Sequence, residues 1–120
     1  MIKSVFAATA ALSMSAGAAF AGPYINVETE SGFAGSDYEG TITEAVVGYE
    51  GTLGESTGWY VEAGPALVSP DGEESETEFF AEAGVAVDLT ENLELYGEVS
   101  LLTGDDANGY GTKAGVTYRF

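Results

Sequence analysis

The chain has 120 residues, with 20 acidic residues, 3 basic residues and a formal net charge of −17. Such an acidic surface repels nucleic acid, so we expect no nucleic-acid partner. The sequence contains neither cysteine nor histidine. It therefore has no disulfides, and it lacks the commonest general base and the commonest metal ligand. These absences count against an enzyme, and we expect no cofactor.

The first 21 residues have the pattern of a signal peptide. Lys3 precedes an apolar, alanine-rich run, and Ala19-Phe20-Ala21 fits the small-x-small rule for cleavage. Polar residues interrupt this run, so it is less apolar than a membrane-spanning helix. We therefore predict a signal peptide at residues 1–21, cleaved after Ala21, and one β domain at residues 22–120.

The rest of the chain alternates between apolar and polar residues, with breaks rich in Gly, Asp, Ser and Asn. It shows no helical periodicity of useful length. The pattern predicts an all-β fold, an antiparallel up-and-down meander of about six strands. The predicted strands are Pro23–Glu30, Thr41–Glu50, Gly58–Val68, Thr77–Leu89, Leu93–Leu102 and Tyr110–Phe120.

Successive side chains of a strand point to opposite faces of its sheet. One face of the predicted sheet is almost free of charge, with residues such as Val27, Val61 and Val99. The other face carries an ionisable residue near the middle of every strand, beside tyrosines and glycines. These ionisable residues are Glu28, Glu44, Glu62, Glu82, Glu98 and Lys113.

Two places fit the alternation less well. Ile42 and Val46 share the face of Glu44, so the second strand has apolar residues on the charged face. Pro65 lacks the N–H group that a paired strand donates, so we expect a bulge or an unpaired position there.

Alternation alone leaves two arrangements open. In a soluble sandwich or barrel the apolar face is the core, whereas in a membrane barrel it contacts lipid and the polar face lines the interior. Aromatic residues near strand ends are typical of interfacial girdles and favour the membrane. They are Tyr24, Tyr49, Trp59, Tyr60, Phe79, Phe80, Tyr110, Tyr118 and Phe120.

The joins between the predicted strands alternate in character. Ser31–Gly40, Ser69–Glu76 and Thr103–Gly109 are polar and acidic, which suits an external side. Thr90-Glu91-Asn92 is a tight turn that suits the periplasmic side, while Thr52–Thr57 is longer than such a turn needs. An even number of strands then places both termini in the periplasm.

The last six residues, GVTYRF, have Val116, Tyr118 and Phe120 at alternate positions. This end resembles the C-terminal strand of bacterial outer-membrane barrels. GPYINVE, SGFAGSDYEG, VGYEG, WYVEAGPALVSPDG and LYGEVSLLTGDD are similar to stretches of small acidic porin-like proteins of marine bacterial and phage genomes. The resemblance implies an outer-membrane location, contact with its lipid, and recognition of Val116, Tyr118 and Phe120 by the barrel-assembly machinery.

Six strands are fewer than the family pattern requires, because single-chain outer-membrane barrels begin at eight. A six-stranded barrel encloses too little space even for its own side chains. Either a further hairpin is hidden, with Gly32–Gly40 the favoured place, or several copies of the chain complete one barrel as a homo-oligomer.

The ionisable residues carry the functional prediction. If they face one lumen, with Arg119 near its periplasmic rim, five carboxylates favour a cation-preferring pore in an oligomer, although an ordinary polar interior explains the same residues.

The acidic loops lack the ligand spacing of an EF-hand, so we predict solvated loops and no metal site. We expect a porin-like or structural outer-membrane protein. The alternatives are a soluble β-sandwich or barrel, periplasmic or secreted, acting as a binding module, and a surface adhesin or decoy using the acidic external loops.

Overall fold

The computed structural model describes residues 22–120, which form one antiparallel sheet of six strands. The predicted signal peptide and its cleavage site lie outside these residues. The predicted six-stranded meander is confirmed. The strands are β1 (Gly22–Ala34), β2 (Asp37–Leu53), β3 (Thr57–Pro70), β4 (Glu76–Asp88), β5 (Leu93–Leu102) and β6 (Gly109–Tyr118).

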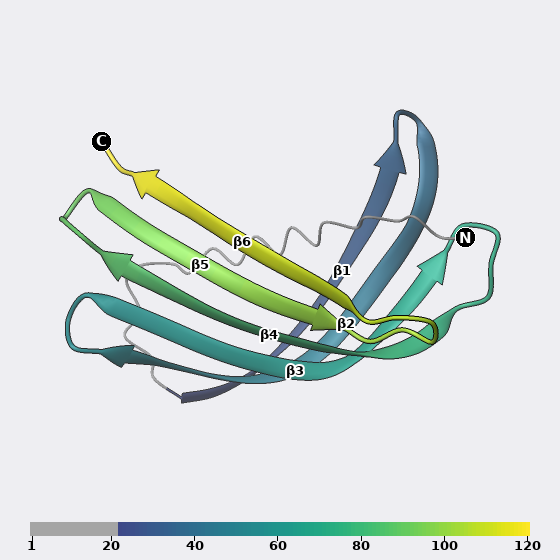
Figure 1. Cartoon of the computed structure of the whole chain (residues 1–120), viewed down its shortest axis with the longest axis horizontal. Helices are drawn as coiled ribbons and strands as arrows, with labels where there is room; N and C mark the ends of the chain where they lie inside the picture. Colours follow the sequence, from purple (N-terminus) through teal and green to yellow (C-terminus); the bar gives the residue numbers. More distant parts are fainter. Residues whose placement is uncertain (1–21) are drawn as a thin grey trace.

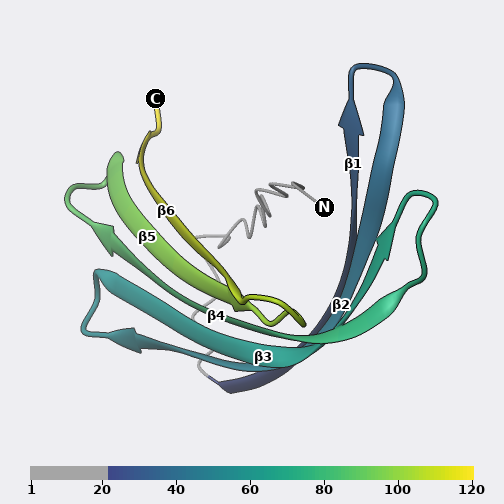
Figure 2. The same ribbon diagram turned by 45° about the vertical axis from the view of Figure 1, so that its right-hand side comes forward.

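Each strand pairs with the next one along the chain, so the sheet order is β1-β2-β3-β4-β5-β6. The sheet curls into a half-barrel, with β1 and β2 on one side and β5 and β6 on the other (Figures 1 and 2). β1 and β6 are its edges, and within residues 22–120 each has a neighbour on one side only. A closed barrel therefore needs a partner for both edges.

β1 and β2 form a long hairpin whose turn consists of Gly35 and Ser36 alone. Gly35 has a φ of +66°, a left-handed conformation that glycine adopts without strain and that tight hairpins favour. The prediction of a loop over the whole of Ser31–Gly40 is therefore wrong. Gly32–Gly40 holds only the turn between β1 and β2, and no additional hairpin is hidden there. The polar residues that indicated a loop belong instead to the exposed ends of two strands.

The connections at the two ends of the sheet differ in length. At one end, here called the turn end, three residues join β2 to β3 and a tight turn at Thr90-Glu91-Asn92 joins β4 to β5. The hydroxyl of Thr90 accepts a hydrogen bond from the Leu93 N–H at 3.1 Å. The opposite end, the loop end, carries the longer connections 71–75 and 103–108 as well as the β1–β2 turn. The β2–β3 join is thus shorter than the sequence predicted.

The two faces of the sheet differ as the alternation predicted. Large apolar side chains cover the convex face and are exposed along every strand, whereas the glutamates lie on the concave face. We call the exposed apolar residues of the convex face the apolar belt. They include Ile25, Val27, Val47, Tyr49, Val61, Leu67, Phe79, Val85, Leu95, Val99, Val116 and Tyr118.

The exceptional pattern of the second strand has a structural reason. Ile42 and Val46 turn onto the concave face and pack with Ala66 and Phe80 in a small buried core, against which Val68 and Leu102 also pack. This core lies toward the loop end, because Ile42 is opposite Val68 and Phe80 is opposite Leu102. The concave face therefore carries this small apolar core toward the loop end as well as the glutamates near its middle.

Pro65 interrupts the pairing of β2 with β3, as predicted. The ladder stops after Glu44↔Ala66 and resumes in the same register at Val47↔Ala63. Gly64 lies in this gap, where a Cβ atom would be 2.8 Å from the Val46 Cα and closer still to the Ala45 carbonyl oxygen. The close approach of two backbones is what requires glycine at this position.

The predicted aromatic girdles are only partly correct. Tyr24, Tyr60 and Phe80 lie on the concave face, and Tyr60 and Phe80 are each only 3% exposed. The exposed rings group instead at the two ends of the sheet. They are Tyr49, Tyr118 and Phe120 toward the turn end, where the half-buried Trp59 stacks on Tyr49, and Phe33, Tyr38, Phe79 and Tyr110 toward the loop end.

Candidate functional site

A row of ionisable side chains crosses the concave face, and we call it the acidic stripe. Cross-strand pairing places its members directly opposite one another within each hairpin. Like charges in such positions repel, so hydrogen-bond donors or cations must stabilise the carboxylates of the stripe. The pairs are Glu28↔Glu44, Glu62↔Glu82 and Glu98↔Lys113.

Tyrosine hydroxyls supply part of that stabilisation. Tyr24 Oη donates to Glu62 Oε2 at 2.7 Å. Tyr60 Oη lies 2.6 Å from Glu82 Oε1 and 2.9 Å from Glu98 Oε1, so one phenolic hydrogen serves two carboxylates. A hydrogen bond to a charged group contributes about 1.5–3 kcal/mol, which offsets part of the repulsion.

Basic residues are few along the stripe. Among residues 22–120, Lys113 Nζ forms an ion pair with Glu98 Oε2 at 3.1 Å, and Arg119 pairs with Glu94 at 3.3 Å. Arg119 follows β6 at the turn end, where its N–H donates to the Asn92 carbonyl at 2.8 Å. Its guanidinium thus stands at the rim of the concave face rather than within the stripe.

The alternation did not reveal that each hairpin repeats one packing unit. Tyr24, Tyr60 and Tyr96 lie opposite Gly48, Gly84 and Gly115, and each ring fills the space that a Cβ of its glycine would occupy. The three tyrosines follow one another at equal intervals of 36 residues, and Asn26, Glu62 and Glu98 stand two residues after them. This spacing is the signal that could have identified a three-hairpin repeat from the sequence.

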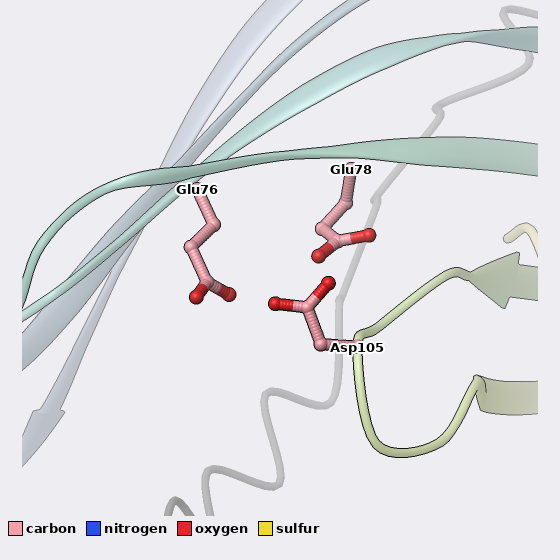
Figure 3. Close-up of side chains that lie close together, drawn as sticks. All are labelled: Glu76, Glu78 and Asp105. Atoms are coloured by element: carbon pink, nitrogen blue, oxygen red, sulfur yellow. The ribbon is translucent and has the colours of Figure 1, made fainter.

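The loop end carries a second acidic group. Glu76, Glu78 and Asp105 offer carboxylate oxygens that all lie within 4.8 Å of one another, and their side chains converge between β4 and the β5–β6 connection (Figure 3). Glu76 stands at the loop tip of β4, beyond the apolar belt, and repulsion from Asp105 is the main cause that raises the pKa of its carboxyl. Glu78 also accepts a hydrogen bond from Thr103 at 2.7 Å.

These three carboxylates could together hold a cation, but neither acidic loop supplies such a group by itself. The sequence predicted two separate acidic joins, Ser69–Glu76 and Thr103–Gly109, and the structure brings one residue of each together with Glu78. The geometry is also that of solvated, mutually repelling acids, so it carries no assignment of a metal.

Comparison with known proteins identifies the class of fold. The family model described as cyanophage outer membrane protein like beta barrel domain matches residues 1–120. The chain belongs to this family. No curated protein matches it, and no solved structure matches it.

Members of the cyanophage outer membrane protein-like family are β-barrel domains, and the family is not an enzyme family. The sequence-based resemblance to porin-like proteins of phage and marine bacterial genomes is thereby confirmed at the level of the barrel family. Among residues 22–120, no helix is long and apolar enough to cross a membrane.

The end of the chain presents the alternate residues that resemble an outer-membrane assembly signal. Val116 and Tyr118 are exposed on the convex side of β6, and the Phe120 ring packs edge-on against Tyr118 with centroids 5.1 Å apart. In the part of the chain that the structure describes, β6 is an edge strand, and one row of its backbone groups has no partner strand.

Proposed function

We propose that the protein is a porin-like β-barrel of the outer membrane, and that the completed barrel encloses a cation-preferring aqueous lumen. The observation that carries this proposal is the opposite chemistry of the two faces. The convex face exposes the apolar belt, and the concave face holds the acidic stripe. A membrane barrel has this arrangement, whereas a soluble barrel has the reverse.

The dimensions of the sheet support the same proposal. The shortest strands, β5 and β6, have 10 residues each, and a tilted transmembrane strand needs about 9–11. Exposed aromatic rings stand at both ends of the apolar belt, where the lipid interfaces would lie. Within residues 22–120 there is no second sheet that covers the belt, as the core of a soluble sandwich would require.

The acidic stripe supports the cation preference. Five carboxylates and one ammonium group cross the concave face, and Glu44, Glu62 and Glu82 are each less than 10% exposed. Acidic rings lower the free energy of a cation within a pore and raise that of an anion. Water and mobile cations in a lumen would also relieve the repulsion between the opposed glutamates.

Planar-bilayer recordings test the pore. The purified protein should give stepwise conductance with a cation-to-anion permeability ratio well above one. The triple variant Glu62→Gln, Glu82→Gln, Glu98→Gln should lower this ratio toward one, because it removes three charges yet keeps acceptors for the tyrosine hydroxyls.

A matched control removes three charges outside the acidic stripe. This control is the triple variant Asp71→Asn, Glu73→Gln, Glu74→Gln in the exposed β3–β4 connection. It should leave the permeability ratio nearly unchanged. If membrane-inserted protein conducts no current, the pore is refuted and a filled, structural barrel stands in its place.

The outer-membrane location is tested by fractionation. The processed protein should stay in the membrane fraction after carbonate extraction and should migrate differently on gels with and without heating. Protein found freely soluble in the periplasm would contradict the proposal and favour an exported soluble module.

We also propose that Val116, Tyr118 and Phe120 act as the recognition element for barrel assembly. Deleting Phe120 should lower the fraction of heat-modifiable, folded protein in the membrane, because the terminal aromatic ring of the last strand is lost. Deleting the exposed loop residue Ala107 is a matched control and should have little effect. Equal folded fractions for the two deletions would refute the role of Phe120.

A further inference from the structure

We infer that two copies of the chain form one closed barrel of twelve strands, in which β6 of each copy pairs with β1 of the other. The inference rests on the proposed function, because it takes the half-barrel to be part of a membrane barrel. Both edges carry a row of backbone groups that have no partner strand within residues 22–120. Open edges of this kind cannot face lipid, so a barrel in a membrane must close them.

The register of the missing pair follows from the repeat. The joins between successive hairpins use the same register, because Gly48 is opposite Glu62 and Gly84 is opposite Glu98. Gly115 is the next glycine in this series. It is covered by the ring of Tyr96, as Gly48 is covered by Tyr24 and Gly84 by Tyr60. By the same rule, Gly115 is opposite Asn26 of the second copy.

The tyrosine hydrogen bonds give an independent reason for this register. Tyr24 reaches Glu62 and Tyr60 reaches Glu98, each across to the next hairpin and each over a separation of 38 residues. Tyr96 has no such acceptor within residues 22–120. In the inferred register, Asn26 of the second copy takes the place of Glu62 and Glu98. Its Nδ2 already donates to Glu28 at 3.2 Å, which leaves Oδ1 as the acceptor.

The charges on the two edges are complementary in the same register. It places Lys113 on β6 opposite Glu28 of the second copy. Glu28 faces the like charge of Glu44 within its own hairpin, and it has no ion pair among residues 22–120. An ammonium group opposite Glu28 adds an attraction that offsets the repulsion between Glu28 and Glu44. On the convex side, the same register pairs apolar Ala114 with Val27 and Val116 with Ile25.

The geometry selects two copies and their relative orientation. Strands alternate in direction, so β1 and β6 run in opposite senses and can pair as antiparallel neighbours only if both copies point the same way. A twofold axis along the barrel then closes both seams at once. Because one copy forms half a barrel (Figure 2), the second copy supplies the missing half. Twelve strands exceed the roughly eight whose interior side chains fill completely.

Cysteine cross-linking tests the seam, and the native chain contains no cysteine. The double variant Val27→Cys, Ala114→Cys places one thiol on each edge, at positions that the inferred register brings face to face. After membrane insertion and oxidation, most of it should migrate at twice the chain mass on denaturing, non-reducing gels. Reduction should restore the single mass.

A matched control shifts one thiol along β6 by four residues. Val27→Cys, Tyr110→Cys should give roughly tenfold less dimer, since a disulfide spans Cα atoms no more than about 7 Å apart. A fast-migrating monomer with an internal disulfide, a ladder of larger cross-linked species, or equal linking of the two variants would each overturn the inference.

The mass of the unmodified protein in detergent, measured by analytical ultracentrifugation, should independently be that of two chains. If the double-cysteine variant inserts poorly, a one-chain mass for the unmodified protein would still overturn the inference. Protein that remains in carbonate-extracted membranes as a single copy would refute the twelve-stranded barrel and leave the proposed outer-membrane function standing.

Discussion

Replacing Val61 by lysine is expected to destabilise the membrane-inserted protein by about 2–4 kcal/mol, the cost of a basic residue on the lipid face near the bilayer midplane. Val61 is 47% exposed on the convex face of β3. It lies between Trp59 at the turn end and Pro65, which is opposite Phe79 toward the loop end. In a soluble protein the same exposed position would tolerate lysine within about 0.5 kcal/mol.

Urea-dependent folding into phospholipid vesicles measures this difference, with the fluorescence of the single tryptophan, Trp59, as the reporter. Ala107→Lys, in the exposed β5–β6 connection, adds the same charge outside the apolar belt and should change the free energy of unfolding little. Equal effects of the two substitutions would show that the convex face is not in contact with lipid.

The alternation predicted much of the fold because each strand encodes its two faces locally. Val61 and Glu62 point in opposite directions whatever the rest of the chain does, so both faces could be assigned before the sheet was known. Which face contacts lipid is a different question. Alternation alone leaves it open. The aromatic rings near the strand ends, the strand lengths, the C-terminal resemblance and the family match all bear on it.

The errors arose where local composition and tertiary structure disagree. The stretch around Gly32 and Gly40 has the composition of a loop, yet only Gly35 and Ser36 leave the strands. Ile42 and Val46 broke the alternation because the concave face contains a small core as well as charges. A pattern of polar and apolar residues cannot reveal such a core, since its members come from three strands.

Parity alone placed the six residues of the acidic stripe on one face, and the cross-strand pairs agree with this. That they line a pore stays a prediction, and the sequence did not reveal their hydrogen-bond partners. The hydroxyl partners were missed because Tyr24 and Glu62 lie on strands that are not neighbours. Such a contact depends on register and curvature, which are properties of the assembled sheet.

Gly64→Val is expected to cost about 3 kcal/mol or more, because the added side chain would enter the backbone of β2. Its Cβ would lie 2.8 Å from the Val46 Cα and would collide with the Ala45 carbonyl, where no flexible group can yield. Gly97→Ala is the matched control, since a Cβ on Gly97 has only the Lys113 carbonyl oxygen nearby, at 3.8 Å. The urea midpoint in vesicles should fall sharply for Gly64→Val and stay unchanged or rise for Gly97→Ala, which gains strand propensity. Similar midpoints for the two variants would mean that β2 and β3 are not held together at the interruption beside Pro65.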